Sequence, residues 1–114
     1  MLRPRVIVSL LPKEDQKTYE RFLDLVIAAL VGTDGLGVTS GDDIRVLLLP
    51  DLCELGLGEE IDIDVELPPH LADLGEKAHF DLAARLCEMF KTQYPQAKIQ
   101  YTCEIRRPVF TYES

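Results

Sequence analysis

The side chains in this sequence that could act as nucleophiles or metal ligands include three cysteines and two histidines. Cys53, Cys87 and Cys103 show no C-x-x-C spacing, and an odd number does not close a disulfide framework. Because they lie within or beside apolar patterns, we expect buried, reduced thiols and no zinc site. His70 follows a Pro-Pro pair and His79 lies in a helical pattern, with no Ser or Cys nucleophile at a recognisable spacing. We interpret both histidines as solvated or core residues.

Three acidic side chains alternate along one strand-like segment, at Asp62, Asp64 and Glu66. Residues two apart on a strand lie on the same face, so these carboxylates share one side of the segment. Copies of this face, brought together around a threefold axis, could gather a hard cation. We favour the simpler interpretation, a solvated strand face, and predict neither a metal nor a cofactor.

Positive charge gathers at two places that are far apart in the sequence. Arg3 and Arg5 open the first predicted strand, while Arg106 and Arg107 close the last one. Judged from the residues alone, these arginines keep the strand ends soluble and pair with the excess carboxylates.

The overall charge balance is acidic, with 20 Asp and Glu against 12 Lys and Arg, a formal net charge of −8. Such a chain repels phosphate backbones and anionic lipids, so we predict no nucleic-acid partner and no membrane association. No apolar run approaches the roughly 18 residues of a membrane span, and Met1–Arg5 is too short for a signal peptide. We expect a cytoplasmic protein whose 114 residues form one domain, 1–114.

Hydrophobic periodicity predicts four strands and two helices, most of them ended by proline. Apolar positions spaced by three and four indicate amphipathic helices over 14–31 and from about 71 or 75 to 94. Between the first helix and the second strand, four glycines predict a loop over 32–41. A phosphate-binding loop is disfavoured there because no Gly-Lys-Ser/Thr follows. The predicted strands are Arg5–Leu11, Ile44–Leu49, Ile61–Leu67 and Lys98–Ile105, with one more β turn over Val109–Tyr112.

The two halves, about 3–50 and 60–107, share the order strand-helix-strand. A constant offset of 57 residues carries Val6, Val8, Leu10 and Pro12 onto Ile63, Val65, Leu67 and Pro69, and Asp24-Leu25 onto Asp81-Leu82. Common patterning of such units remains an alternative to a true duplication.

Each half contains a crossover helix, and right-handed crossovers place both helices on one face of a shared sheet. The sequence therefore predicts an α+β fold, two β-α-β units forming a four-stranded mixed sheet with two helices on one face. Two strand orders satisfy this pattern. In a ferredoxin-like sheet the strands of the two halves interleave, whereas in a tautomerase-like sheet the two strands of each half lie side by side and parallel.

A family resemblance favours the second order. The segments Pro4–Pro12 and Ile44–Pro50, the intervening amphipathic helix and the second strand-helix-strand half resemble the tautomerase superfamily, which includes macrophage migration inhibitory factor. The resemblance implies a homotrimer, in which the sheet faces that lack helices meet around a central axis.

The resemblance also implies a chemistry based on an amino-terminal proline, whose secondary amine acts as a general base when an apolar pocket lowers its pKa. The matching residue is Pro4, which follows Met1-Leu2-Arg3. An acylated proline nitrogen is an amide without useful basicity. Since removal of the initiator methionine normally requires a small second residue, and Leu2 is large, the base is absent unless three residues are trimmed.

Relatives in this superfamily use arginines to hold a substrate carboxylate. The resemblance therefore implies an anion pocket near Pro4, formed by Arg3, Arg5, Arg106 and Arg107. The activity this predicts is keto-enol isomerisation of a small carboxylate-bearing substrate, lost or altered while Met1–Arg3 remain. The alternative is a non-catalytic, ferredoxin-like binding or regulatory module.

Overall fold

The computed structural model describes residues 3–54 and 59–106. Its elements are β1 (Arg5–Leu11), α1 (Gln16–Val31), η1 (Gly41–Asp43), β2 (Arg45–Pro50), β3 (Glu60–Leu67), η2 (Pro69–Leu71), α2 (Glu76–Gln93) and β4 (Lys98–Ile105). The first and last strands have their predicted bounds. α1 begins two residues later than the sequence pattern indicated, because Asp15 is its N-cap and accepts a hydrogen bond from the Thr18 backbone N–H at 2.8 Å. The β turn predicted over Val109–Tyr112 lies outside the described residues.

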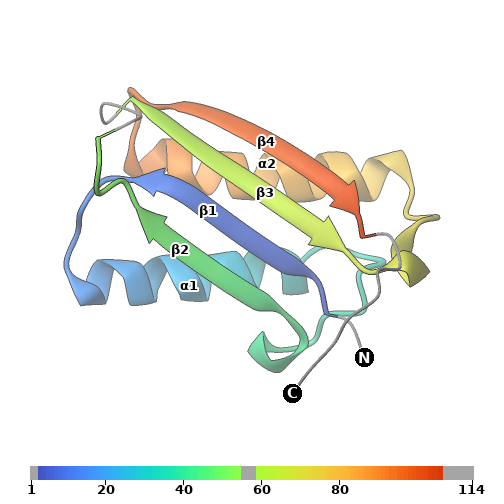
Figure 1. Cartoon of the computed structure of the whole chain (residues 1–114). Coiled ribbons are helices and arrows are strands. Elements are labelled where there is room, and N and C mark those ends of the chain that lie inside the picture. Colours follow the sequence, from blue (N-terminus) through green and yellow to red (C-terminus); the bar gives the residue numbers. More distant parts are fainter. Residues whose placement is uncertain (1–2, 55–58, 107–114) are drawn as a thin grey trace, which may run out of the picture.

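The four strands form one sheet in the order β2-β1-β3-β4 (Figure 1). β1 pairs with β2 in parallel and β3 pairs with β4 in parallel, while β1 and β3 meet antiparallel at the centre. Each half therefore keeps its own two strands side by side. This order confirms the tautomerase-like arrangement and excludes the interleaved, ferredoxin-like one.

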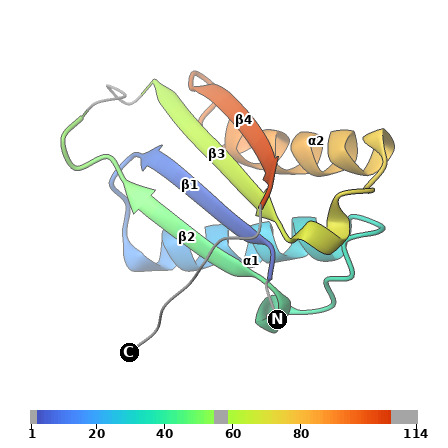
Figure 2. The same cartoon turned by 45° about the vertical axis from the view of Figure 1, so that its right-hand side comes forward.

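Both helices cover the same face of the sheet, as Figure 2 shows from a second direction. Between the helices and the sheet lies the apolar core, in which alternate residues of β1 and β3 meet one stripe from each helix. Its largest fully buried side chains from the helices are Phe22, Val26 and Leu30 of α1 and Leu82, Leu86 and Phe90 of α2.

The offset of 57 residues between the halves does not hold through the end of β1. Leu10 has a φ of +62°, and the register with β2 shifts between Val8 and Leu11. This irregularity turns Leu11, rather than Leu10, into the core, where it is 0% exposed. In the second half the alternation continues without a bulge and buries Leu67.

The other face of the sheet carries no helix, and we call it the open face (Figure 1). Because side chains alternate, the residues that do not enter the core point to this face. Its β1–β2 half includes the apolar residues Ile7, Leu47 and Leu49, and its β3 strand carries Asp62, Asp64 and Glu66. The open face is thus apolar along one side and acidic along the middle.

Candidate functional site

Residues from all four strands converge at one end of the sheet. Because β1 is parallel to β2 and antiparallel to β3, the start of β1 lies beside the start of β2 and the end of β3, and Arg5 is paired with both Arg45 and Glu66. β4 runs parallel to β3 and ends beside it, where the Arg106 backbone N–H donates to the Leu67 carbonyl at 2.7 Å. The start of β1, which carries Arg5, and the end of β4, which is followed by Arg106, are therefore neighbours in space.

Pro4 lies at this end, immediately before β1, and is buried. Its carbonyl accepts a hydrogen bond from the Arg45 backbone N–H at 2.9 Å, which fixes the proline against the start of β2. Arg3 acylates the Pro4 nitrogen, is itself exposed, and donates from its guanidinium to the Asp42 carbonyl at 3.2 Å. The proline has a fixed place at the edge of the core, but its nitrogen is an amide in this chain.

Glu66 joins two of the arginines that the sequence placed far apart. Arg106 Nη2 lies 3.0 Å from Glu66 Oε2, and Arg5 Nη2 binds the same oxygen. The three side chains are between 23% and 31% exposed, so this ion pair is only partly open to solvent. Arg107 lies outside the described residues. Of the four predicted anion-binding arginines, the structure thus brings Arg5 and Arg106 together and directs Arg3 to Asp42.

The charge of this Arg5–Glu66–Arg106 cluster follows from its protonation states. Burial alone would raise the pKa of Glu66, but the hydrogen bonds from Arg106 and Arg5 outweigh burial and hold that pKa below its ordinary value. The carboxylate is therefore ionised at neutral pH, and the cluster keeps one net positive charge. The Arg5 Nε–H is buried and has no hydrogen-bond partner among the described residues. Such a cluster can hold one carboxylate.

Glu66 is the member of this cluster that the sequence analysis did not assign to the site. The alternation of β3 placed its side chain on a polar face together with Asp62 and Asp64, but nothing local distinguishes it from them. Its position at the end of the strand is the signal that could have singled it out, because strand ends are where the arginines lie.

The cysteines and histidines do not join this cluster. All three cysteines are free; Cys53 is exposed, so the expectation of a buried thiol was wrong there, because the residue lies in a turn after β2. Cys87 and Cys103 are half-buried, and burial raises the pKa of both thiols, which makes them poor nucleophiles. His70 is exposed and His79 half-buried. Within residues 3–54 and 59–106, no group of three or more His, Cys, Asp or Glu side chains is placed to hold a metal ion.

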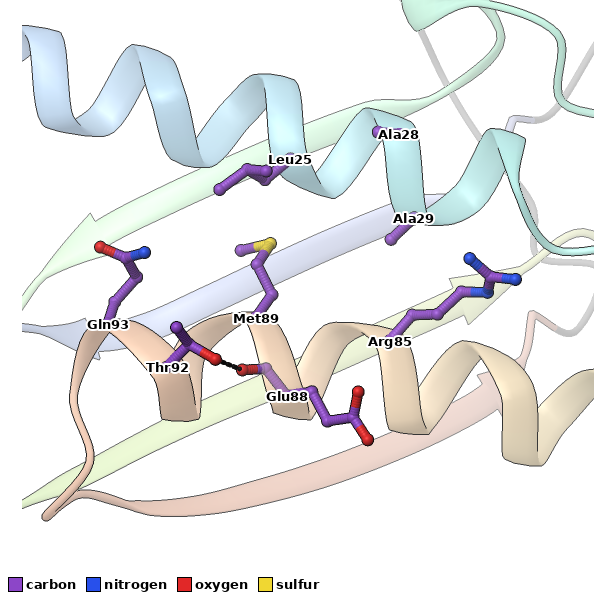
Figure 3. Close-up of a pocket in the computed structure, with 8 residues that line it drawn as sticks. All are labelled: Leu25, Ala28, Ala29, Arg85, Glu88, Met89, Thr92 and Gln93. Carbon is purple, nitrogen blue, oxygen red and sulfur yellow. Dashed lines mark hydrogen bonds between the residues drawn. The ribbon is translucent and has the colours of Figure 1, made fainter.

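Two clefts lie away from Pro4. The interhelical cleft, of about 430 Å³, lies between α1 and α2 (Figure 3). Arg85 and Met89 extend from α2 towards α1 there, whereas Glu88 points away from it. A second cleft of about 310 Å³ lies between α2 and the edge strand β4.

No protein-family model matches the sequence, and no curated protein matches it significantly. Solved structures do. The crystal structure of Pt0534 inactivated by 2-oxo-3-pentynoate superposes with a TM-score of 0.70 at 16% identity, over 90% of this chain and 85% of that one. The macrophage migration inhibitory factor-like protein of Entamoeba histolytica gives 0.67 at 12% identity, over 90% and 88%. The chain has the tautomerase fold.

Other structures with the tautomerase fold support the same conclusion. An asymmetric trimer of fused wild-type 4-OT superposes with a TM-score of 0.67 at 19% identity, covering 90% of this chain and 85% of that one. A 5-carboxymethyl-2-hydroxymuconate delta-isomerase gives 0.54 at 12% identity, over 98% and 87%. In the part of the chain that the structure describes, no helix is both long and apolar enough to cross a membrane.

Proposed function

We propose that this tautomerase-fold protein isomerises a small carboxylate-bearing keto acid between its keto and enol forms, with Pro4 as the general base, once Met1–Arg3 have been removed. While those residues remain, the protein lacks this activity. The observation that supports the proposal is the position of Pro4, buried at the end of the sheet where Arg5, Glu66 and Arg106 form a cluster with one net positive charge.

Keto-enol isomerisation of such a substrate needs a general base and a group that binds the substrate carboxylate. A proline with a free nitrogen is a secondary amine, and an apolar environment disfavours its protonated form, which lowers its pKa towards neutrality. The amine takes a proton from the carbon next to the substrate carbonyl, the electron pair moves to the carbonyl oxygen, and protonation of that oxygen completes the enol. The arginine cluster holds the substrate carboxylate during this transfer.

The extension before Pro4 abolishes the base. In the chain with Met1–Arg3 the Pro4 lone pair is delocalised into the preceding carbonyl, so the nitrogen does not accept a proton. The hydrogen bond from the Arg3 guanidinium to the Asp42 carbonyl also holds Arg3 beside Pro4. Removal of three residues would release both constraints.

The test compares the chain that retains Met1–Arg3 with one that begins at Pro4, each checked by intact mass. Phenylpyruvate and hydroxyphenylpyruvate tautomerisation is then measured on both. We expect turnover only in the chain that begins at Pro4, and its loss when that residue is Pro4→Gly. Equal turnover in both chains would identify a different base, and turnover in neither would favour a non-catalytic binding role.

We further propose that the protein assembles as a homotrimer through its open face. Ile7, Leu47 and Leu49 leave apolar side chains there that the chain's own helices do not cover, and Leu49 is 45% exposed. One of the solved structures with this fold is itself a trimer. The acidic residues of β3 oppose close approach of copies, so Arg45, on the same face, would have to offset part of their charge.

A further inference from the structure

The cleft between α2 and β4 is built from two regular elements. Glu76, His79, Phe80 and Ala83 recur at the spacing of one helical stripe, so they project from the same side of α2. Tyr101 and Cys103 are two apart on β4 and share the strand face that meets this stripe. Because β4 is the edge strand of the sheet, no strand among residues 3–54 and 59–106 closes the outer side of the cleft. We call this the α2–β4 cleft.

The α2–β4 cleft is the right size for a small organic molecule. Its volume of about 310 Å³ lies at the lower end of the range of small-molecule sites, which begins at roughly 300 Å³. An apolar cavity of about 150 Å³ already accommodates benzene, so one aromatic ring with a short substituent fits here. Ala83 contributes only a methyl group to the wall and so keeps this space open.

The side chains that line the cleft also select for charge. Glu76 is its one carboxylate, and neither a lysine nor an arginine is among the residues that line it. Burial raises the pKa of both Tyr101 and Cys103, so neither of them contributes a negative charge near neutral pH. An anionic ligand would be repelled by Glu76, with His79 the one lining side chain able to carry a positive charge, whereas a cationic ligand would be attracted to Glu76 and to a chain of net charge −8.

We propose that the α2–β4 cleft binds a small organic cation, a primary ammonium joined by a short chain to one apolar ring. The ring lies against Ala83, Tyr101 and Cys103, and the ammonium lies at the mouth beside Glu76. Phe80 lines the cleft and is 73% exposed, so its ring is available to a cation at the mouth. The proposed occupant has the opposite charge to the substrate proposed for the Pro4 site, so the two sites do not compete for one ligand.

The interhelical cleft provides an internal comparison. It is larger, and Arg85 extends into it while the Glu88 carboxylate points away, so it offers a cation no facing carboxylate (Figure 3). A ligand that recognised apolar surface alone would enter either cleft. Preference for the α2–β4 cleft by a cation therefore distinguishes recognition by charge from binding to apolar surface in general.

The experiment is a titration of the full chain, isotopically labelled and followed by NMR, with three probes of similar shape: 2-phenylethylamine as its ammonium salt, 2-phenylethanol and phenylacetate. We expect saturable shifts at Glu76, His79, Ala83 and Cys103 with the ammonium probe. An exposed charge pair contributes roughly 0.2–1 kcal/mol, so the ammonium should bind about three-fold more tightly than the alcohol at low salt, and phenylacetate most weakly. Added salt should reduce the difference between the ammonium and the alcohol.

Three variants assign the effect to residues. Glu76→Gln should bring the affinity of the ammonium down towards that of the alcohol and leave the affinity of the alcohol unchanged. Ala83→Leu fills the cleft and should abolish binding of both probes. Glu88→Gln is the matched control, because it removes a carboxylate from the same helix at the interhelical cleft, and it should change nothing.

Three results would overturn the proposal: equal affinity for the ammonium and phenylacetate, equal affinity for the ammonium and the alcohol, or shifts that map to the interhelical cleft. An absence of saturable shifts with the ammonium probe would overturn it as well. If Ala83→Leu does not fold, as judged by circular dichroism, comparison of Glu76→Gln with Glu88→Gln still tests whether the Glu76 carboxylate recognises the ammonium. None of these binding measurements depends on whether Met1–Arg3 are present, so their result is independent of the tautomerase assay.

Discussion

At the scale of single residues, Glu66 links separate strands outside the core. It accepts hydrogen bonds from Arg5 on β1 and Arg106 beyond β4, and so ties three strands together at one end of the sheet. A carboxylate between two guanidiniums also sets the charge of the proposed substrate site.

We expect Glu66→Gln to lower the free energy of unfolding at pH 7 by roughly 1–2 kcal/mol, because charge-assisted hydrogen bonds are the stronger kind and this one is partly exposed. The pKa of Glu66 is lowered in the folded state. Its stabilisation is therefore fully present above the unfolded-state pKa of about 4.3 and is lost as the pH falls through the lower folded-state pKa. Urea unfolding of both proteins at pH 7, 5 and 3 should show the difference shrinking at the lowest pH.

The matched control is Asp64→Asn, on the same strand and face but exposed and without an ion pair among the described residues. Its effect should stay within about 0.5 kcal/mol. A pH-independent loss in Glu66→Gln would show that packing, rather than charge, explains its contribution.

Tyr101 is the opposite case, because removal of its polar group should increase the stability of the fold. Its hydroxyl is buried without a hydrogen bond to the described residues, beside the Cys103 thiol, which is a weak partner. We expect Tyr101→Phe to raise the free energy of unfolding by about 1 kcal/mol, because an unsatisfied buried hydroxyl is costly. Thermal and urea unfolding measure this, and a destabilised variant would show that the hydroxyl has a partner.

At the scale of elements, an aromatic cluster holds α1 against α2. The ring centroids of Phe22 and Phe90 are 5.4 Å apart, and those of Phe22 and Tyr94 are 6.0 Å apart, and both pairs are edge to face. The Tyr94 hydroxyl also donates to Glu14 Oε1 at 2.9 Å, just before α1. Burial and the hydrogen bond to Glu14 both raise the pKa of Tyr94, so this hydroxyl stays protonated as a donor well above neutral pH.

We expect Phe90→Leu to lower the free energy of unfolding by about 1–3 kcal/mol, because Phe90 is fully buried and its loss removes both area and an aromatic contact. Phe80→Leu makes the same chemical change on the same helix at a residue that is 73% exposed. That variant should differ from the parent by no more than about 0.5 kcal/mol. Equal effects of the two substitutions would contradict the assignment of Phe90 to the core.

At the scale of the whole molecule, the open face is the surface through which the proposed homotrimer would assemble. The proposed homotrimer predicts a mass in solution three times the 12.9 kDa of one protomer, measurable by light scattering. Ile7→Lys places a charge among the apolar residues of the open face and should shift the mass to that of a monomer.

Leu52→Lys is the control for Ile7→Lys, because Leu52 is 71% exposed in the turn after β2 and not on the open face. It should leave the trimer intact. A parent chain that is monomeric at micromolar concentration would contradict the assembly while leaving the fold unchanged.

The sequence by itself determined the type and approximate bounds of the four strands and two α-helices that the structure describes, but it did not predict η1 or η2. Period-two alternation identified β3 and β4, three-and-four spacing identified α1 and α2, and prolines marked the ends, because these signals depend on residues close together in the chain. The cysteine pattern also predicted buried, free thiols. Cys87 and Cys103 are free but only half-buried, and Cys53 is exposed, since a turn position cannot be read from apolar neighbours alone.

Only the tertiary structure decided the strand order, and with it the site. Both candidate folds use the same periodicities, so the choice between them depends on which strands pair across the sheet. That pairing is decided by long-range packing and leaves no local trace. The contact of Arg5 and Arg106 with Glu66, the bulge at Leu10 and the α2–β4 cleft all follow from that pairing, because each brings together residues whose neighbourhood the chain order does not specify.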